Sequence, residues 1–383
     1  MNAPFSLYLH FPYCWSKCHY CAFNSVRYDK PQSLRFLSAL KKEIARYGGR
    51  TGVRDRRLIT LYMGGGTPSI FNADQILEVL DCSRRHFNFA DDIEVTMEAN
   101  PGTVDLEKLT ALKSGGVHRL SLGVQSFRDG ELTRLGRAHG PRVAREAYGT
   151  AREAGFDNVN LDFMYALPDQ RLEDWDRTLD EAIGIGPEHL SAYALTIEEG
   201  TRFGADYDRG LLVLPDEERQ VRFDEWTHAK LADAGYVRYE VSNYARSGHA
   251  CRHNLGYWSQ REYLGLGPGA HSYFDGRRFS KTEDIDAYIH DVDAGGEAIE
   301  ESEAIDPTQA GREALIFGLR KAEGVRLDEI RNQYPVTDPV RLQQTFDQWS
   351  RDDLVVLDPP RIRLSSKGLG LWDRIAEEIT AVL

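Results

Sequence analysis

The sequence predicts an α/β protein: an incomplete (β/α)6-type barrel followed by a C-terminal, helical, winged-helix-like domain. Three observations predict this fold. Short apolar runs alternate with helix-forming segments six times, a glycine-rich stretch follows them, and the pattern changes to consecutive helices near Pro307. Alternating strands and helices are typical of a parallel sheet, and six units without a break favour a curved sheet over a flat one.

The barrel elements follow from hydrophobic spacing. Six short apolar runs are predicted to be strands: 6–11, 58–63, 93–98, 119–123, 159–163 and 189–194. Between them, segments rich in helix formers at helical spacing are predicted to be helices: 34–47, 73–87, 104–113, 142–154 and 172–183. In such a fold the carboxyl ends of the strands carry the chemistry.

The rest of the chain falls into two regions. A helix at 216–234, a strand at 236–241 and a glycine-rich stretch at 265–270 are predicted to extend or close the barrel. From Pro307 three helices precede two short strands, 354–357 and 361–364, and a last helix, an order that resembles a winged helix. We therefore expect a barrel over 1–235, a barrel extension over 236–300 and a C-terminal domain over 301–383.

Composition narrows the class of protein. The chain has 383 residues, is 41% hydrophobic and carries a net charge of −13, which disfavours nucleic acid and anionic membrane as main partners. Residues 301–383 contain 11 Lys and Arg against 15 Asp and Glu, so we expect the winged-helix-like domain to be a packing or partner module. No apolar run is long enough to span a membrane, and residues 1–5 lack the build of a signal peptide, so a cytoplasmic protein is expected.

Three of the five cysteines lie close together, directly after the first predicted strand. Cys14, Cys18 and Cys21 have the spacing C-x3-C-x2-C. Three thiolates on one loop can hold three corners of a 4Fe-4S cluster and leave the fourth iron open to S-adenosylmethionine (SAM). Lys17 is expected to favour the thiolate forms. The alternatives are a zinc site with His19 as fourth ligand, or ordinary free cysteines; zinc usually takes two separated cysteine pairs.

Small and polar residues follow the other strands. A glycine run, Gly64-Gly65-Gly66 before Thr67 and Pro68, allows close approach of the backbone to a ligand, and no Gly-Lys-Ser/Thr follows it to make a phosphate loop. Polar side chains also stand at or after strand ends: Glu98, Gln125, Asp162 and Arg137. Each alone is more simply a cap or a surface charge, but a barrel would bring all four to its mouth.

A third motif lies near the glycine-rich stretch. His253-Asn254-Leu255-Gly256-Tyr257-Trp258 places a histidine beside aromatic rings, a combination that can ligate heme iron and cover a porphyrin face. The alternative is a hydrogen-bonded histidine next to core aromatics. Covalent heme attachment is not expected, because no C-x-x-C-H occurs.

Together these motifs resemble the oxygen-independent coproporphyrinogen oxidase family of radical SAM proteins over nearly the whole chain. The segments that carry the resemblance are the run from Leu7 to the cysteine triad, Gly64 to Pro68, Glu98 to Pro101, Gly123 to Gln125, Leu161 to Tyr165 and Gly265 to Gly267. The resemblance implies SAM contacts at Tyr8, Tyr20, Gly65, Gly66, Thr67, Glu98, Gln125, Arg137, Asp162 and, more weakly, Ala194.

Two departures point to one branch of that family. The coproporphyrinogen-converting enzymes have a fourth cysteine two residues after the third, where this chain has Phe23, and they have an N-terminal extension for which no room is expected here. The H-N-x-x-Y-W motif instead matches the heme chaperone branch, which implies a heme site at His253, Asn254, Tyr257 and Trp258.

The expected function is therefore heme binding without turnover. The implied ligands are a 4Fe-4S cluster, SAM and heme. The implied partners are acceptor hemoproteins of the respiratory chain and a small electron-donor protein, with no nucleic acid and with membrane contact only through partners. The alternative is an oxygen-independent coproporphyrinogen III dehydrogenase or another radical SAM enzyme of porphyrin biosynthesis acting on a tetrapyrrole.

Overall fold

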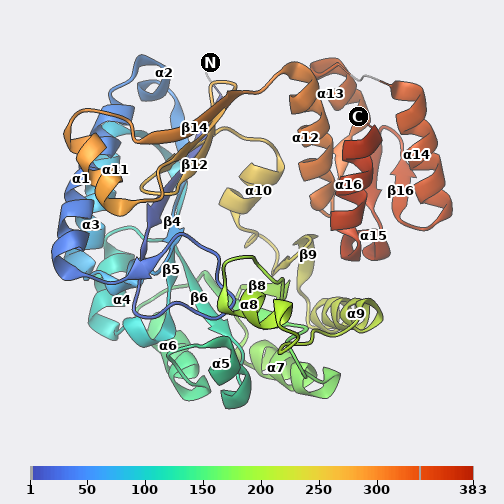
Figure 1. The fold of residues 1–383 in the computed structure, drawn as a ribbon, viewed down its shortest axis with the longest axis horizontal. Coiled ribbons are helices and arrows are strands. Elements are labelled where there is room, and N and C mark those ends of the chain that lie inside the picture. Colours follow the sequence, from blue (N-terminus) through green and yellow to red (C-terminus); the bar gives the residue numbers. More distant parts are fainter. Residues whose placement is uncertain (1–2, 336–337, 383) are drawn as a thin grey trace.

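The structure, a computed structural model, describes residues 3–335 and 338–382. Met1 and Asn2 belong to residues 1–5, for which no signal peptide is expected, and lie outside the described residues. One curved sheet runs through most of the molecule, with helices around its outer side (Figure 1). Six central strands lie in chain order and run parallel: β1 (Phe5–Phe11), β4 (Arg57–Gly65), β5 (Asn88–Ala99), β6 (Arg119–Gln125), β7 (Val159–Tyr165) and β8 (His189–Ala194).

The connecting helices cover the outer face of this sheet. They begin where the sequence supplies a cap: Asp29 accepts a hydrogen bond from the Gln32 backbone, and Asn72 with Gln75 forms a reciprocal capping box. The helices of the six units are α1 (Lys30–Gly48), α2 (Thr51–Arg54), α3 (Ala73–His86), α4 (Leu106–Ser114), α5 (Asp129–Leu135), α6 (Pro141–Glu153) and α7 (Leu172–Ile185). The predicted strands and helices are all present, and α2 and α5 are additional short helices.

The strands have two chemically different faces. Residues that face the helices, such as Leu7, Leu61 and Met97, are apolar and fully buried. The alternate residues are mostly polar and point into the space that the sheet encloses, so the hydrophobic core lies outside the curve of the sheet and the polar groups inside it.

Further strands continue the sheet at both edges. On one side β11 (Tyr263–Leu266) pairs parallel to β1, followed by the antiparallel strands β12 (His271–Phe274), β13 (Arg277–Lys281) and β14 (Ile299–Ala304). On the other side β10 (Asn243–Ala245) and β9 (Val237–Glu240) follow β8. In the described residues β14 and β9 are the two ends of the sheet and do not pair with each other, so the predicted incomplete barrel is confirmed.

The glycine-rich stretch contains a strand that the sequence did not reveal. Gly265 and Leu266 belong to β11, and a Cβ atom at Gly265 would collide with the carbonyl oxygen of His271 on the next strand. Glycine here permits the close approach of two neighbouring strands. The stretch extends the sheet and does not close it.

Three more helices lie in the middle of the chain: α8 (Arg202–Asp208), α9 (Glu217–Asp233) and α11 (Ile285–Asp293). A fourth, α10 (Arg252–Trp258), lies between the sheet and the C-terminal helices and contacts both β4 and α12 (Figure 1). The H-N-x-x-Y-W motif forms nearly all of α10. Within the described residues, no helix is both long enough and apolar enough to cross a membrane.

The C-terminal region has its own hydrophobic cluster, centred on Leu319, Phe346 and Ile362. Its elements follow the predicted order: α12 (Pro307–Arg320), β15 (Val325–Arg326), α13 (Leu327–Gln333), α14 (Pro339–Arg351), the hairpin β16 (Val355–Asp358) and β17 (Arg361–Leu364), then α15 (Ser366–Gly370) and α16 (Trp372–Val382). The three-part division at 235 and 300 stays a prediction.

Candidate cluster and cofactor site

The cysteine triad lies on a loop at the carboxyl end of β1. The loop is tied at its base, because β2 (Tyr13–Cys14) pairs with β3 (Val26–Arg27) and the Cys14 Sγ atom lies 3.4 Å from Thr67 Oγ1. All three cysteines are free and partly buried, while Trp15 and Phe23 beside them are 54% and 60% exposed. The three thiols therefore face the barrel mouth from one short, anchored segment.

Burial, and not Lys17, dominates the protonation of two of these thiols. Desolvation raises the pKa of Cys14 and of Cys21 above the ordinary value, and the nearby positive charges oppose this only in part. Lys17 does lower the pKa of Cys21, as expected, but burial raises that pKa by more, and Lys17 is not among the main influences on Cys14. The cation in direct contact with the triad is Arg137, which donates from Nη1 to Cys18 Sγ over 3.3 Å.

Both ring nitrogens of His19 have hydrogen-bond partners, which argues against His19 as the fourth ligand of a zinc ion. Its Nε2 atom lies 2.9 Å from the guanidinium of Arg202, which can only donate, so Nδ1 carries the proton and donates to the Arg134 carbonyl oxygen over 2.8 Å. In the described part of the chain, no three His, Cys, Asp or Glu side chains are arranged to hold a single metal ion.

The glycine run packs tightly against the cluster loop. Gly65 has φ = 104°, a conformation that L side chains rarely adopt. A Cβ atom at Gly66 would lie 2.6 Å from the Tyr13 carbonyl oxygen, and the Gly66 N–H donates to the Phe11 carbonyl oxygen over 2.8 Å. The glycines thus allow the turn after β4 to support the cysteine loop, a contact within the protein that the motif alone did not indicate.

Glu98 lies at the end of β5 in a polar but secluded position. Its carboxylate accepts hydrogen bonds from Tyr62 Oη over 2.8 Å and from the Gly65 N–H over 3.1 Å. Burial nevertheless raises the pKa of Glu98 to about 7. A cationic group bound beside it would favour the ionised form.

The other strand-end residues lie around the same mouth. Gln125 ends β6 with φ = 67°, and Asp162 on β7 accepts from Ser121 Oγ over 3.0 Å and from Asn160 Nδ2 over 2.8 Å. Arg137 donates from Nη2 to the Gly123 carbonyl oxygen over 2.6 Å, while its buried Nε has no partner in the described residues. A cation with a spare donor fits the carboxylate of an amino-acid ligand such as SAM.

Tyr8, Tyr20 and Ala194 complete the predicted set. The Tyr8 hydroxyl lies 3.0 Å from His10 Nδ1 on the inner side of β1, and Tyr20 on the cysteine loop interacts with Arg137. Ala194 is the last residue of β8. The structure thus brings the predicted SAM contacts to one end of the barrel, around the cysteine loop.

Several inner side chains were not predicted. Tyr62 holds Glu98, His10 anchors the cysteine loop by a 2.7 Å contact from Nε2 to the Asn24 carbonyl oxygen, and the buried Arg119 has an Nε without a partner among the described residues. All three lie an even number of residues along a strand from a residue of the predicted motifs, and therefore on the same face of the sheet. The period-2 recurrence of polar residues, as in Thr60-Tyr62 and Asp162-Asn160, is the signal that could have found them.

The H-N-x-x-Y-W motif does not lie at the cysteine loop. His253 is 1% exposed; its Nδ1 lies 2.8 Å from Thr60 Oγ1 and its Nε2 lies 2.9 Å from Tyr257 Oη. Burial lowers the pKa of His253 to about 3, with Arg261 and Arg119 adding to the effect. The ring is therefore neutral and both of its nitrogens are engaged, whereas Asn254, Tyr257 and Trp258 are only partly buried.

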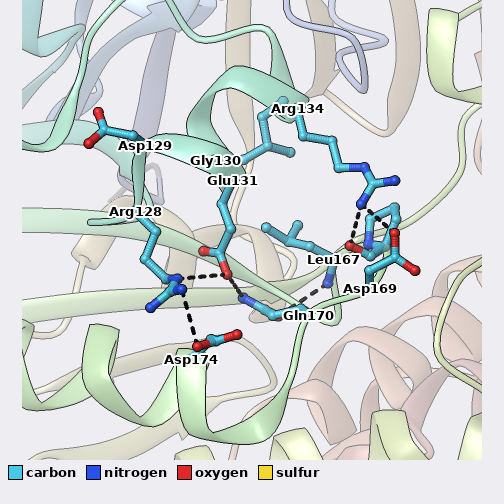
Figure 2. A pocket seen from close by; sticks show the side chains of 11 residues that line it. Arg128, Asp129, Gly130, Glu131, Arg134, Leu167, Asp169, Gln170 and Asp174 are labelled. Carbon is cyan, nitrogen blue, oxygen red and sulfur yellow. Dashed lines mark hydrogen bonds and ion pairs between the residues drawn. The ribbon is translucent and has the colours of Figure 1, made fainter.

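A cavity of about 450 Å³ opens beside α5 and the segment 167–174. Figure 2 shows that its charged side chains point toward one another: Arg128 pairs with Asp174 at 3.2 Å and Arg134 with Asp169 at 2.7 Å. None of the predicted contact residues lines this cavity. Since both of its arginines are already paired, it offers no spare cation for an anionic ligand.

Comparison with known proteins agrees with this geometry. Residues 8–182 match the radical SAM superfamily. The heme chaperone HemW of Bacillus subtilis is 35% identical over 330 residues, 86% of this chain and 86% of the relative, and that of Escherichia coli is 42% identical over 288 residues, 73% and 74% of the two chains.

A solved structure extends the likeness to the whole fold. Coproporphyrinogen III oxidase HemN from Escherichia coli, described as a radical SAM enzyme, matches with a TM-score of 0.84 and 25% identity, covering 99% of this chain and 91% of that chain. The predicted family and fold class are confirmed, and from these identities over most of its length the chain belongs to the HemW family of radical SAM proteins.

Proposed function

We propose that this chain is a heme-binding chaperone that carries a 4Fe-4S cluster and SAM and delivers heme to hemoproteins of the respiratory chain. The observation that carries the proposal is its 35–42% identity, over most of its length, with proteins named heme chaperones. Phe23 supports a carrier over an enzyme, because it occupies the position of the fourth cysteine in the coproporphyrinogen-converting branch.

Cys14, Cys18 and Cys21 would hold three irons of the cluster. Their loop is anchored at both ends by the pairing of β2 with β3, and the other two cysteines, Cys82 and Cys251, are buried elsewhere. Arg137 would stabilise the charge of the Cys18 thiolate through its existing contact. When bound and reduced, such a cluster supplies an electron to the sulfonium of SAM.

The strand ends would hold SAM. Arg137 has a free donor for the ligand carboxylate, and the ionisable Glu98, held by Tyr62 and Gly65, would accept from its ammonium group. Asp162 and Gln125 would accept hydrogen bonds from more distant parts of the ligand. The contacts of Tyr8, Tyr20, Gly66, Thr67 and Ala194 are proposed with them, because all belong to the same end of the barrel.

We further propose that the chain acts in the cytoplasm and receives electrons from a small electron-donor protein. A 4Fe-4S cluster on three thiols requires reduced cysteines and a source of single electrons, and the acidic chain favours partners other than nucleic acid. Contact with a membrane would come only through the hemoprotein acceptor.

The triad is tested by anaerobic reconstitution. Cys14→Ala, Cys18→Ala and Cys21→Ala should each lose most of the iron and sulfide that the unchanged chain retains, since each removes one of three cluster ligands. Cys82→Ala is the matched control and should keep both. If Cys82→Ala loses the cluster while a triad variant keeps it, the assignment is wrong.

The rival function is coproporphyrinogen dehydrogenation, which the likeness to HemN over the whole fold favours. Two parallel assays on the anaerobically purified chain separate it from the chaperone. Titration should show stoichiometric binding of heme, and incubation with coproporphyrinogen, SAM and a reductant should give no multiple-turnover product. Formation of protoporphyrinogen over many turnovers would contradict the carrier function and support the enzyme.

A further inference from the structure

A cleft of about 280 Å³ lies between the barrel and the C-terminal helices, on the outer side of α10. Five aromatic rings line it: Tyr257, Trp258, Tyr263, Tyr273 and Phe317. Tyr257 and Tyr263 pack edge to face with ring centroids 4.5 Å apart, and Trp258 lies 6.3 Å from Phe317 of α12. Rigid rings from both sides of a cleft suit a flat apolar ligand.

The cleft also contains one cation without a carboxylate partner. Within the described residues the Arg261 guanidinium donates only to the Arg252 carbonyl oxygen, over 3.3 Å, and forms no ion pair. Its neighbour Arg278 is already neutralised, because Glu313 accepts from both of its terminal nitrogens at 2.6 and 3.1 Å. Glu94 attracts this charge only from a distance, without an ion pair, so a ligand carboxylate in direct contact with Arg261 would be favoured.

A buried indole donor strengthens this assignment. The Nε1 atom of Trp258 is buried and has no hydrogen-bond partner among the described residues. Buried donors are rarely left unpaired in native proteins, and a bound ligand or an ordered water is one way to satisfy them. Trp258 and Arg261 both line this aromatic cleft, and beyond its one backbone contact the Arg261 guanidinium keeps further N–H groups for a ligand.

The hydrogen bonds of His253 keep it out of this cleft. Thr60 donates its hydroxyl proton to Ser6 Oγ, so it accepts from His253 Nδ1–H, and His253 Nε2 must then accept from the Tyr257 hydroxyl. The histidine acts from inside the barrel as a positioning residue for Tyr257. The aromatic half of the motif, Tyr257 and Trp258, is the half that faces the cleft.

We propose that this cleft receives one carboxylate-bearing edge of a porphyrin, with a propionate on Arg261 and the ring edge among the aromatic side chains. The assignment rests on the proposed heme-carrier function and locates its ligand. Pockets that enclose a ligand of this kind measure about 300–1,000 Å³. A cleft of about 280 Å³ therefore covers only part of the macrocycle, and the exposed remainder is accessible to an acceptor protein.

Titration of the full chain with three probes tests the assignment: hemin, metal-free protoporphyrin IX and protoporphyrin IX dimethyl ester. Since stacking and the carboxylate provide the anchorage, metal-free protoporphyrin should bind about as tightly as hemin. Arg261→Gln should weaken both di-acids by on the order of ten-fold, the effect of losing one charge-assisted contact, and leave the diester unchanged. Glu313→Gln frees Arg278 and should strengthen di-acid binding several-fold.

Arg246→Gln is the matched control, because Arg246 also stacks on a tyrosine ring, that of Tyr236, but lies outside the cleft. Its affinities should equal those of the unchanged chain. If Arg261→Gln and Glu313→Gln bind all three probes like the unchanged chain, or if only hemin binds, the cleft assignment is overturned while heme binding stands. If the unchanged chain binds neither hemin nor protoporphyrin, the proposed function itself fails.

Discussion

Glu98 shows how burial and hydrogen bonding compete at a single residue. Two donors hold the carboxylate, yet its pKa is raised to about 7, so desolvation is the larger effect in the absence of a ligand. A carboxyl whose pKa is higher in the folded than in the unfolded protein destabilises the fold as pH rises from about 4.5 to 7. Above that range the full cost of the buried charge is present.

Glu98→Gln should therefore stabilise the ligand-free protein at pH 8 and change it little at pH 4.5. Glutamine keeps an acceptor for the Tyr62 hydroxyl but carries no charge. We expect a Tm higher by roughly 2–5 °C at pH 8, from differential scanning calorimetry at both pH values. Glu107→Gln, an exposed carboxyl in the first turn of α4, is the control; an equal gain at both pH values would contradict the account.

Gly66 is the residue at which the turn after β4 approaches the cysteine loop most closely. Gly66→Ala places a methyl group 2.6 Å from the Tyr13 carbonyl oxygen, so the loop must shift, at a cost of about 1–3 kcal/mol. Both the free energy of urea unfolding and the iron retained after reconstitution should fall. Gly102→Ala, where nothing lies within 4 Å, should change neither.

At the scale of the elements, the strands and their order follow from apolar runs, whereas the inner polar network does not. The carboxyl-end residues Glu98 and Asp162 could be predicted, because parallel strands end at one mouth. The partners of these residues could not be identified from single motifs. Tyr62, for instance, holds Glu98 across a strand pair and 36 residues of sequence.

Of the elements around the barrel, α10 is the one whose position the sequence could predict least. Its histidine contacts Thr60, 193 residues away, and its start is held by Glu94 of β5, which accepts from the backbone N–H groups of Arg252 at 3.2 Å and His253 at 3.1 Å. These contacts place the motif at the amino-terminal side of the strands. The cysteine loop lies at the opposite, carboxyl-terminal side.

Because α10 and the cysteine loop lie at opposite ends of the strands, a substitution that weakens the support of α10 should leave the cluster intact. Glu94→Ala should remove the support of α10 and lower the free energy of unfolding by about 1–3 kcal/mol, the cost of leaving buried N–H groups unpaired. The variant should still reconstitute its iron and sulfide, since the cysteine loop is at the other end. Urea unfolding and iron analysis check both halves; loss of the cluster without loss of stability would contradict this arrangement.

At the scale of the whole molecule, a buried ion pair joins the C-terminal region to the sheet. Glu240 of β9 is fully buried and pairs with Arg320 of α12 at 2.9 Å, while Ala322 donates its N–H to the Tyr239 carbonyl oxygen over 3.0 Å. The C-terminal region therefore covers the β9 edge of the open barrel. Its winged-helix-like order was predictable from local pattern, but this attachment was not.

Arg320→Ala should leave the Glu240 charge buried and unpaired, at a cost of about 3–5 kcal/mol. Urea unfolding should show the loss, and limited proteolysis should cut faster between residues 300 and 307. Arg326→Ala breaks a pair whose two side chains are 40% and 45% exposed, and should cost less than about 1 kcal/mol. Equal effects of the two variants would argue against the attachment.

In the part of the chain that the structure describes, no element covers the opposite edge of the sheet, which is β14. Every residue of β14 is exposed, and the strand carries Glu300, Glu301 and Glu303. Two molecules that met edge to edge would bring these glutamates against one another, and like charges on adjacent strands oppose pairing. An open barrel can thus keep a long free edge without growing into fibres, because the edge strand itself carries the charges that oppose pairing.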